Sequence, residues 1–146
     1  MNDLKICVVG LGYVGLPLAV AFAEKFHVTG FDINSSRIQE LNNNIDKTLE
    51  VDEKLLEKIG KNIDFISDIN DASNCDIYII TVPTPIDKAN RPNLKPLTDS
   101  SMLVGKILNK DNIVIYESTV YPGVTEDICV PELENASGLK FNKDFF

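Results

Sequence analysis

The sequence has few basic residues, and this scarcity limits what it can bind. It contains 14 Lys and Arg against 22 Asp and Glu, which gives a net charge of −8 at pH 7, and no Lys/Arg cluster stands out. A domain that binds nucleic acid carries such a cluster as its electrostatic footprint. We therefore expect no nucleic-acid partner, and an anionic ligand must be held by local dipoles.

Long apolar runs are also missing. The longest of them is too short to span a bilayer. The first residues, MNDLKICVVGLG, enter a strand and lack the basic region, apolar region and cleavage site of a signal peptide. We expect a cytoplasmic protein without a membrane partner.

Cysteine is scarce as well. Cys7, Cys75 and Cys129 are odd in number and widely spaced, which suits neither a disulfide framework nor a zinc site. We expect no metal site, and we expect the three side chains to be buried as small hydrophobic groups.

What the sequence does contain is an alternation of two patterns. Apolar runs that suit buried parallel strands alternate with stretches of helical period. Strands are predicted over 5–9, 27–32, 63–68, 76–83 and 112–118, helices over 13–25, 33–44, 51–60, 97–108 and 124–134, and a proline-rich loop over 83–96. Five strands joined by helical crossovers predict the α/β class, as a doubly wound parallel sheet (Rossmann fold) in a single domain.

Glycines interrupt the chain directly after the first predicted strand, in ICVVGLGYVG (6–15). Gly10, Gly12 and Gly15 open a helix, and Asp32 follows 22 residues after Gly10, a pattern typical of dinucleotide-binding domains. Gly10 allows a tight turn, Gly12 lets the backbone approach a pyrophosphate, and Gly15 lets the helix pack closely on the strand. Free N–H groups at the helix start would hold the phosphates. The alternative is a glycine turn with an unrelated surface aspartate.

Two side chains bear on the choice of dinucleotide. Asp32 can accept both hydroxyls of the adenosine ribose and would repel a 2′-phosphate, which favours NAD over NADP. Arg37, five residues further on, could instead receive a 2′-phosphate. The two side chains thus point to different cofactors.

Hydroxyl side chains follow the fourth and fifth predicted strands, in TVPTP (81–85) and ESTVYPG (117–123). Because ligands of open α/β sheets lie outside the carboxyl ends of the strands, we expect Thr84, Ser118 and Thr119 to converge on one crevice. The alternative is that the prolines only end the strands and the threonines only suit them.

The stretches KICVVGLGYVGLPLAVAFA, VTGFDINSSRIQEL, YIITVPTPID and IVIYESTVYPGVTED resemble the N-terminal domain of the UDP-glucose/GDP-mannose dehydrogenase family. The bacterial UDP-N-acetylhexosamine 6-dehydrogenases are the most similar in character. The resemblance implies oxidation of the C6 alcohol of a UDP-sugar to a carboxylate with two NAD, through an aldehyde and a cysteine thioester. The resemblance also implies that the product is a uronic-acid precursor of capsule and O-antigen polysaccharides.

The resemblance also implies roles for single residues. It places Tyr13 and Val14 at the pyrophosphate, Asp32 and Arg37 at the adenosine ribose, Pro83 and Thr84 at the middle of the cofactor, and Ser118 and Thr119 at the nicotinamide. Thr119 also matches a catalytic threonine beside the reacting water and lysine.

Family members are nearly three times as long as this chain. Their central helical region and C-terminal UDP-sugar-binding domain, with the catalytic Lys, Asn and Cys, have no counterpart here, and KFNKDFF (140–146) stands where a sixth strand should begin. We therefore expect residues 1–146 to be an NAD-binding domain that is inactive alone, from a protein that is a homo-oligomer at full length. A stand-alone NAD-binding or redox-sensing module, and the N-terminal domain of a β-hydroxyacid dehydrogenase, stay open as alternatives.

Overall fold

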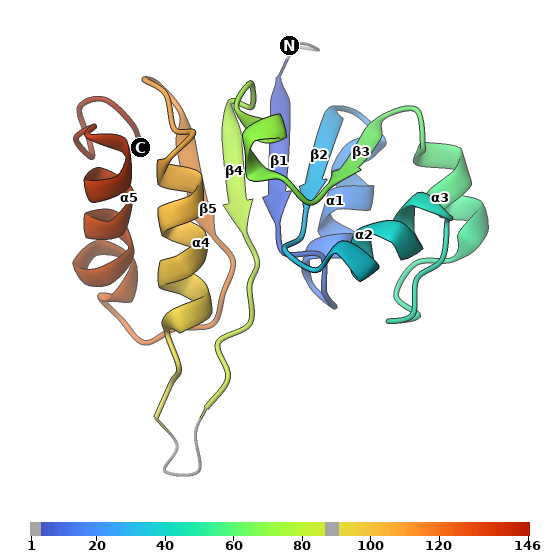
Figure 1. Cartoon of the computed structure of the whole chain (residues 1–146), viewed down its shortest axis with the longest axis horizontal. Helices are drawn as coiled ribbons and strands as arrows, with labels where there is room; N and C mark the ends of the chain where they lie inside the picture. The colour runs from blue at the N-terminus through green and yellow to red at the C-terminus, as the bar shows by residue number, and fades with distance from the viewer. Residues whose placement is uncertain (1–3, 87–90) are drawn as a thin grey trace.

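A computed structural model describes residues 4–86 and 91–146, and within them the chain forms one parallel sheet (Figure 1). The strands are β1 (Lys5–Val9), β2 (His27–Phe31), β3 (Ile63–Ile66), β4 (Ile77–Ile80) and β5 (Ile113–Tyr116). Their order is β3-β2-β1-β4-β5, with every neighbouring pair parallel. The predicted doubly wound sheet is confirmed, with most of its strands ending earlier than expected.

Helices connect the strands and cover both faces of the sheet. They are α1 (Gly15–Ala23), α2 (Ser35–Asn42), α3 (Glu53–Ile59), α4 (Lys95–Gly105) and α5 (Val130–Ser137), with a 3₁₀ turn η1 (Ile69–Ala72) and a π turn η2 (Thr125–Cys129). Asn34 is the N-cap of α2, and its side chain accepts hydrogen bonds from the N–H groups of Ser36 and Arg37.

All five predicted helices are observed with different bounds, and three of the differences have a local cause. The helix predicted from residue 13 begins at Gly15, because the glycine turn extends through Val14. Helix α4 begins at Lys95 instead of residue 97, since Pro96 fits its first turn, where no N–H is needed. The predicted loop over 83–96 is correspondingly shorter, and its residues 87–90 lie outside the described part.

The helix predicted over 124–134 is divided at Pro131. Pro131 lacks the N–H that an α-helix would bond back to Asp127. The residues before it form the π turn, in which the N–H of Val130 donates to the carbonyl of Thr125, and α5 then continues to Ser137.

The core consists of two clusters, one on each face of the sheet. In β1, Ile6 and Val8 belong to the cluster under α1, α2 and α3, whereas Cys7 and Val9 belong to the cluster under α4 and α5. Successive strand residues point to opposite faces, so a continuous apolar run serves both. All three cysteines are free and buried, as expected.

The turn over residues 140–145 brings the last described residue beside β5. The N–H of Phe146 donates to the carbonyl of Asn112 (2.9 Å), and the N–H of Val114 donates to the carbonyl of Phe146 (2.7 Å). These two bonds flank Ile113 in the pattern of a parallel ladder. Phe146 therefore takes a ladder position at the edge where the sixth strand was predicted to begin.

The close contact between α4 and α5 predicts that a side chain added at Gly105 lowers the stability of the domain. A Cβ added at Gly105 would lie 2.7 Å from the Cβ of Ala136 and 3.1 Å from the carbonyl oxygen of Leu133. We expect Gly105→Ala to lower the free energy of unfolding by roughly 1–2 kcal/mol, because the two helices must move apart. Gly60→Ala is the matched control, since its Cβ would make only ordinary contacts. Urea unfolding measures both, and equal stability of the two variants would contradict this packing.

Candidate functional site: a cleft at the carboxyl edge of the sheet

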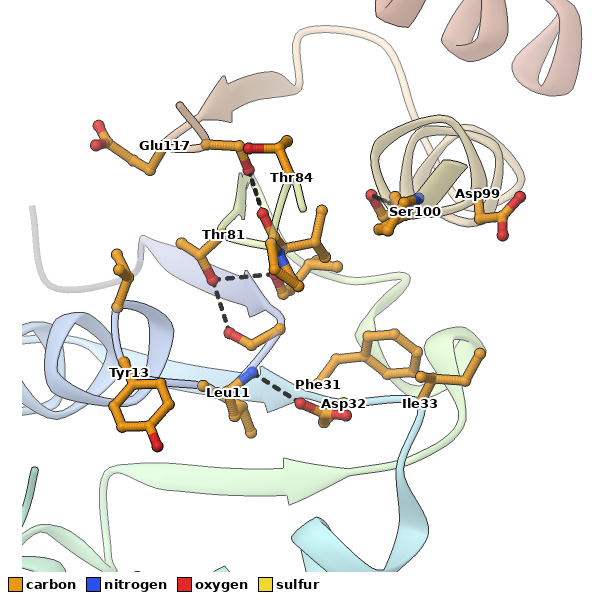
Figure 2. A pocket seen from close by; sticks show the side chains of 18 of the residues that line it. Leu11, Tyr13, Phe31, Asp32, Ile33, Thr81, Thr84, Asp99, Ser100 and Glu117 are labelled. Atoms are coloured by element: carbon orange, nitrogen blue, oxygen red, sulfur yellow. Dashed lines mark hydrogen bonds between the residues drawn. The ribbon is translucent and has the colours of Figure 1, made fainter. Parts of the chain in front are cut away.

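A cleft of ≈ 890 Å³ lies at the carboxyl ends of β1, β2, β4 and β5 (Figure 2). Its volume is within the range of about 300–1,000 Å³ that is usual for sites of small ligands and cofactors. The strand order reverses between β1 and β4, which is where open α/β sheets bind their ligands. All the predicted cofactor-binding residues line the cleft except Gly15 and Arg37.

The glycine turn after β1 is fixed by close backbone contacts. Gly10 has a φ of +96°, which glycine adopts without steric cost. The N–H of Gly10 donates to the carbonyl of Phe31 (2.8 Å), which ties the turn to β2. A Cβ at Gly15 would collide with the carbonyl oxygen of Gly10 and with the Thr81 hydroxyl, so α1 reaches the turn only without a side chain there.

Thr81 is a buried part of this arrangement that sequence reasoning missed. Its Oγ1 lies 2.7 Å from the carbonyl oxygen of Gly10 and 3.1 Å from that of Val9. One hydroxyl at the end of β4 therefore anchors the turn that follows β1. The available signal in the sequence was that Thr81, the first residue of TVPTP, is polar and comes directly after an apolar run.

The outer part of the turn is open to solvent. A Cβ built at Gly12 would meet no atom within 4 Å, and Tyr13 and Val14 are 70% and 56% exposed. The turn thus presents bare backbone and the start of α1 to the cleft. A pyrophosphate fits such a surface, because a helix start offers free N–H groups and the positive end of the helix dipole.

Asp32 lies at the end of β2, where the sequence placed it. Its Oδ2 accepts a hydrogen bond from the N–H of Leu11 (2.9 Å), and its Oδ1 accepts one from the N–H of Asn34 (2.9 Å). Each carboxylate oxygen has further acceptor capacity, which suits two vicinal hydroxyls of a ribose. Ile33, which is 79% exposed, offers an apolar surface beside them.

Arg37 lies behind the turn and does not line the cleft. Its Nε donates to the carbonyl of Leu11 (2.9 Å), and its guanidinium contacts the carboxylates of Asp46 (2.8 Å) and Glu40 (3.4 Å). Only 9% of the Arg37 side chain is exposed. The positively charged guanidinium of Arg37 therefore has protein partners on several sides.

Asp46 completes this buried group, and sequence reasoning missed it. Its side chain is fully buried. Burial opposes ionisation, but hydrogen bonds from the Thr48 hydroxyl, the Val51 N–H and Arg37 outweigh it and lower the pKa of Asp46 to about 2. The available signal was an aspartate with a threonine two residues later, a spacing typical of side-chain-stabilised turns.

The loops after β4 and β5 are joined by hydroxyl groups. The Ser118 hydroxyl donates to the carbonyl of Val82 (2.6 Å), and the Thr84 hydroxyl donates to the carbonyl of Thr119 (2.7 Å). The predicted convergence of Thr84, Ser118 and Thr119 on one crevice is therefore observed. Toward a ligand, the Thr84 and Ser118 hydroxyls offer their oxygen atoms as acceptors.

The first turns of α4 form a wall of the cleft that the sequence did not predict. Lys95, Pro96, Asp99, Ser100 and Leu103 line it, together with Asn93 just before the helix. Lys95 and Asp99 form an ion pair (2.7 Å). Their spacing of four residues was a helix signal, but the loop prediction extended to residue 96. Glu117, directly after β5, also lines the cleft.

Residues 4–146 match the sequence model of the UDP-glucose/GDP-mannose dehydrogenase family, NAD binding domain. The chain belongs to this family. This membership confirms the resemblance found in the sequence and decides against the β-hydroxyacid dehydrogenase alternative. NAD is the cofactor of the domain family.

Individual relatives agree with this assignment. The chain is 57% identical over 146 residues to the UDP-N-acetyl-D-glucosamine 6-dehydrogenase of Pseudomonas aeruginosa, covering 100% of this chain and 34% of that protein. It is 58% identical over 142 residues to Protein CapL of Staphylococcus aureus, covering 97% of this chain and 33% of that protein. The chain therefore spans about a third of the length of these relatives.

A solved structure confirms the fold. The UDP-D-ManNAc dehydrogenase of Pyrococcus horikoshii superposes with a TM-score of 0.91 at 32% identity, over 97% of this chain and 34% of that one. In the part of the chain that the structure describes, no helix is long and apolar enough to cross a membrane. Residues 4–86 and 91–146 also contain no cluster of three His, Cys, Asp or Glu side chains that could hold a metal ion.

The lowered pKa of Asp46 predicts how stability changes in acid. A carboxyl with a pKa of about 2 in the folded state and 3.8 in the unfolded state stabilises the fold above pH 4, and this stabilisation is lost as the pH falls toward 2. It amounts to about 2 kcal/mol. We expect the difference in unfolding free energy between the wild type and Asp46→Asn to shrink between pH 5 and pH 2 in denaturant titrations. A constant difference would contradict the assignment.

Proposed function

We propose that this chain is the NAD-binding domain of a nucleotide-sugar 6-dehydrogenase, which oxidises the C6 alcohol of a UDP-N-acetylhexosamine to the uronic acid with two NAD. The main observation behind this proposal is the cleft between the glycine turn, Asp32 and the loops that follow β4 and β5. It lies in a chain 57% identical to a UDP-N-acetyl-D-glucosamine 6-dehydrogenase. The proposal includes a cytoplasmic location and a role in capsule or O-antigen synthesis. The similarity to Protein CapL supports only the role in capsule synthesis. The whole protein is proposed to be a homo-oligomer.

The order of the groups along the cleft suggests how the cofactor lies. Asp32 would accept the hydroxyls of the adenosine ribose, and the backbone at Gly12, Tyr13 and Val14 would hold the pyrophosphate. Pro83 and Thr84 follow β4 and would border the middle of the cofactor. Ser118 and Thr119, after β5, would border the nicotinamide.

The chemistry of the whole protein needs a nucleophile that this chain does not place at the cleft. NAD, when bound, would supply the hydride acceptor, and the thioester chemistry would require a thiolate beside the reacting carbon. Cys7 is in β1, Cys75 precedes β4, Cys129 is in η2, and all three are buried in the core under α4 and α5. Thr119 is exposed at the cleft and is the residue of this chain that we propose to act in catalysis, by orienting the reacting water or a lysine.

The open space at Gly12 gives a direct test of cofactor binding. We expect the wild type to bind NADH more tightly than NADPH, and Gly12→Val to weaken NADH binding at least ~10-fold, because the side chain fills the space of the pyrophosphate. The melting temperature should stay the same, since a Cβ at Gly12 meets no atom within 4 Å.

Gly15→Val is the contrasting variant. A side chain there collides with Gly10 and Thr81, so the melting temperature should fall. The affinity for NADH, by fluorescence titration, and the melting temperature are measured for the wild type, Gly12→Val and Gly15→Val. Unchanged NADH affinity of Gly12→Val would falsify the proposed place of the pyrophosphate.

The role of Thr119 is tested in a longer protein that carries this domain and the sugar-binding part. We expect Thr119→Ala to lower kcat about 10²-fold with little change in KM for NAD, because a group that orients water acts mainly in the transition state. The 146-residue chain alone should produce no NADH from UDP-sugars. Turnover by this chain, or an unchanged kcat of the variant, would contradict the proposal.

A further inference from the structure

The segment that carries Ser118 and Thr119 leaves the sheet at Tyr116, the last residue of β5. It then runs to the π turn η2, which ends at Cys129. Residues 117–123, all of which the structure describes, form neither helix nor strand. Contacts outside the backbone ladder must therefore hold this segment in place.

Tyr116 is fixed by a hydroxyl of helix α4. Its hydroxyl oxygen lies 2.6 Å from Ser101 Oγ, and Ser101 Oγ lies 2.8 Å from the carbonyl oxygen of Leu97. Because a serine has one hydroxyl hydrogen and a carbonyl only accepts, Ser101 donates to Leu97 and Tyr116 donates to Ser101. Ser101 is fully buried. A buried pair of hydroxyls, each with its hydrogen in use, thus joins the end of β5 to the middle of α4.

Cys129 brings the far end of the segment to the same place. Burial raises the pKa of the Cys129 thiol, and hydrogen bonds with Ser101 and Tyr116 oppose the rise. Burial also raises the pKa of Tyr116 well above its ordinary value, so the phenol stays protonated and remains a donor. Tyr116 and Cys129 therefore meet at Ser101, and the segment between them is a loop with both ends fixed beside one residue of α4.

On the cleft side, the same loop is tied to the residues that follow β4. The Ser118 hydroxyl donates to the carbonyl of Val82 (2.6 Å), and the Thr84 hydroxyl donates to that of Thr119 (2.7 Å). Because Ser118 comes two residues after Tyr116, a shift of the Tyr116 backbone moves Ser118 with it. The loop that borders the cleft thus depends on a contact behind it.

We propose that Ser101 and Tyr116 are positioning residues for the nicotinamide side of the cleft: their buried hydroxyl pair fixes the loop that carries Ser118 and Thr119. This inference rests on the proposed binding of NAD in the cleft. Neither Ser101 nor Tyr116 lines the cleft, so the pair acts through the loop. It affects the nicotinamide half of the cofactor and leaves the adenosine half, at Asp32 and the glycine turn, unchanged.

The test compares NADH with ADP-ribose, which keeps the adenosine, the pyrophosphate and the second ribose but lacks the nicotinamide. Calorimetry measures both Kd values for the wild type and for Tyr116→Phe, which removes the hydroxyl and keeps the ring. We expect the Kd for NADH to rise about fivefold while the Kd for ADP-ribose stays the same, because one hydrogen bond that holds the loop is lost. Ser101→Ala should act in the same direction and more strongly, since it leaves the buried Tyr116 hydroxyl without its acceptor.

Tyr78→Phe is the matched control. Tyr78 is a fully buried tyrosine of β4 whose hydroxyl donates to the carbonyl of Ala72 (2.9 Å), and it lines no part of the cleft. This variant loses one buried hydrogen bond, as Tyr116→Phe does, so the melting temperatures of both should fall. Both Kd values of Tyr78→Phe should equal those of the wild type, which separates the position of the loop from the stability of the fold.

Equal changes of the two Kd values in Tyr116→Phe, or no change in either, overturn this inference. So does a rise of the Kd for NADH in Tyr78→Phe that matches the rise in Tyr116→Phe. If Tyr116→Phe does not fold, Ser101→Ala decides by the same comparison.

A wild type that binds ADP-ribose as tightly as NADH also overturns this inference, because the nicotinamide then gains nothing from the loop. In all these cases the wild type still binds NADH, and the proposed function stands. A wild type that binds neither ligand overturns the proposed function, and this inference with it.

Discussion

The approach of helix α1 to the turn after β1 is the constraint on which the cleft depends. No side chain fits at Gly15, because its place is occupied by the carbonyl of Gly10 and by the hydroxyl of Thr81. With that contact made, α1 starts directly at the carboxyl edge of the sheet. The bare backbone at Gly12 then faces open space, and the anion-binding end of the helix is set by the fold without help from lysines.

The parts of this arrangement that the sequence predicted share one property: they depend on short stretches of chain. The strand that ends just before Gly10, the acid that follows β2 and the hydroxyls after β4 and β5 are each visible within a few residues. Parallel strands then bring their carboxyl ends together without further information. The pairing of Thr84 with the backbone of Thr119 follows from that placement, although its hydrogen bond could not be predicted.

The parts that could not be predicted depend on long-range contacts. Asp46 lies in a segment without helix or strand period, so nothing local indicates that it is buried against Arg37. The same holds for Leu11, whose role comes from contacts with Gly30, Asp32 and Arg37. The π turn before Pro131 also has no sequence period of its own, because a single turn with i→i+5 bonds interrupts an otherwise helical pattern.

The three buried thiols give this domain internal reporters of its own motion. Cys7 is in the central strand, Cys75 precedes β4, and Cys129 ends the π turn, so the three thiols lie in different segments around one core. A thiol reagent reaches such a side chain only when the surrounding structure opens, and its rate of reaction measures the free energy of that opening. The protein therefore carries reporters of local and global unfolding at three positions of one core, and a dye meant for the surface needs an added cysteine.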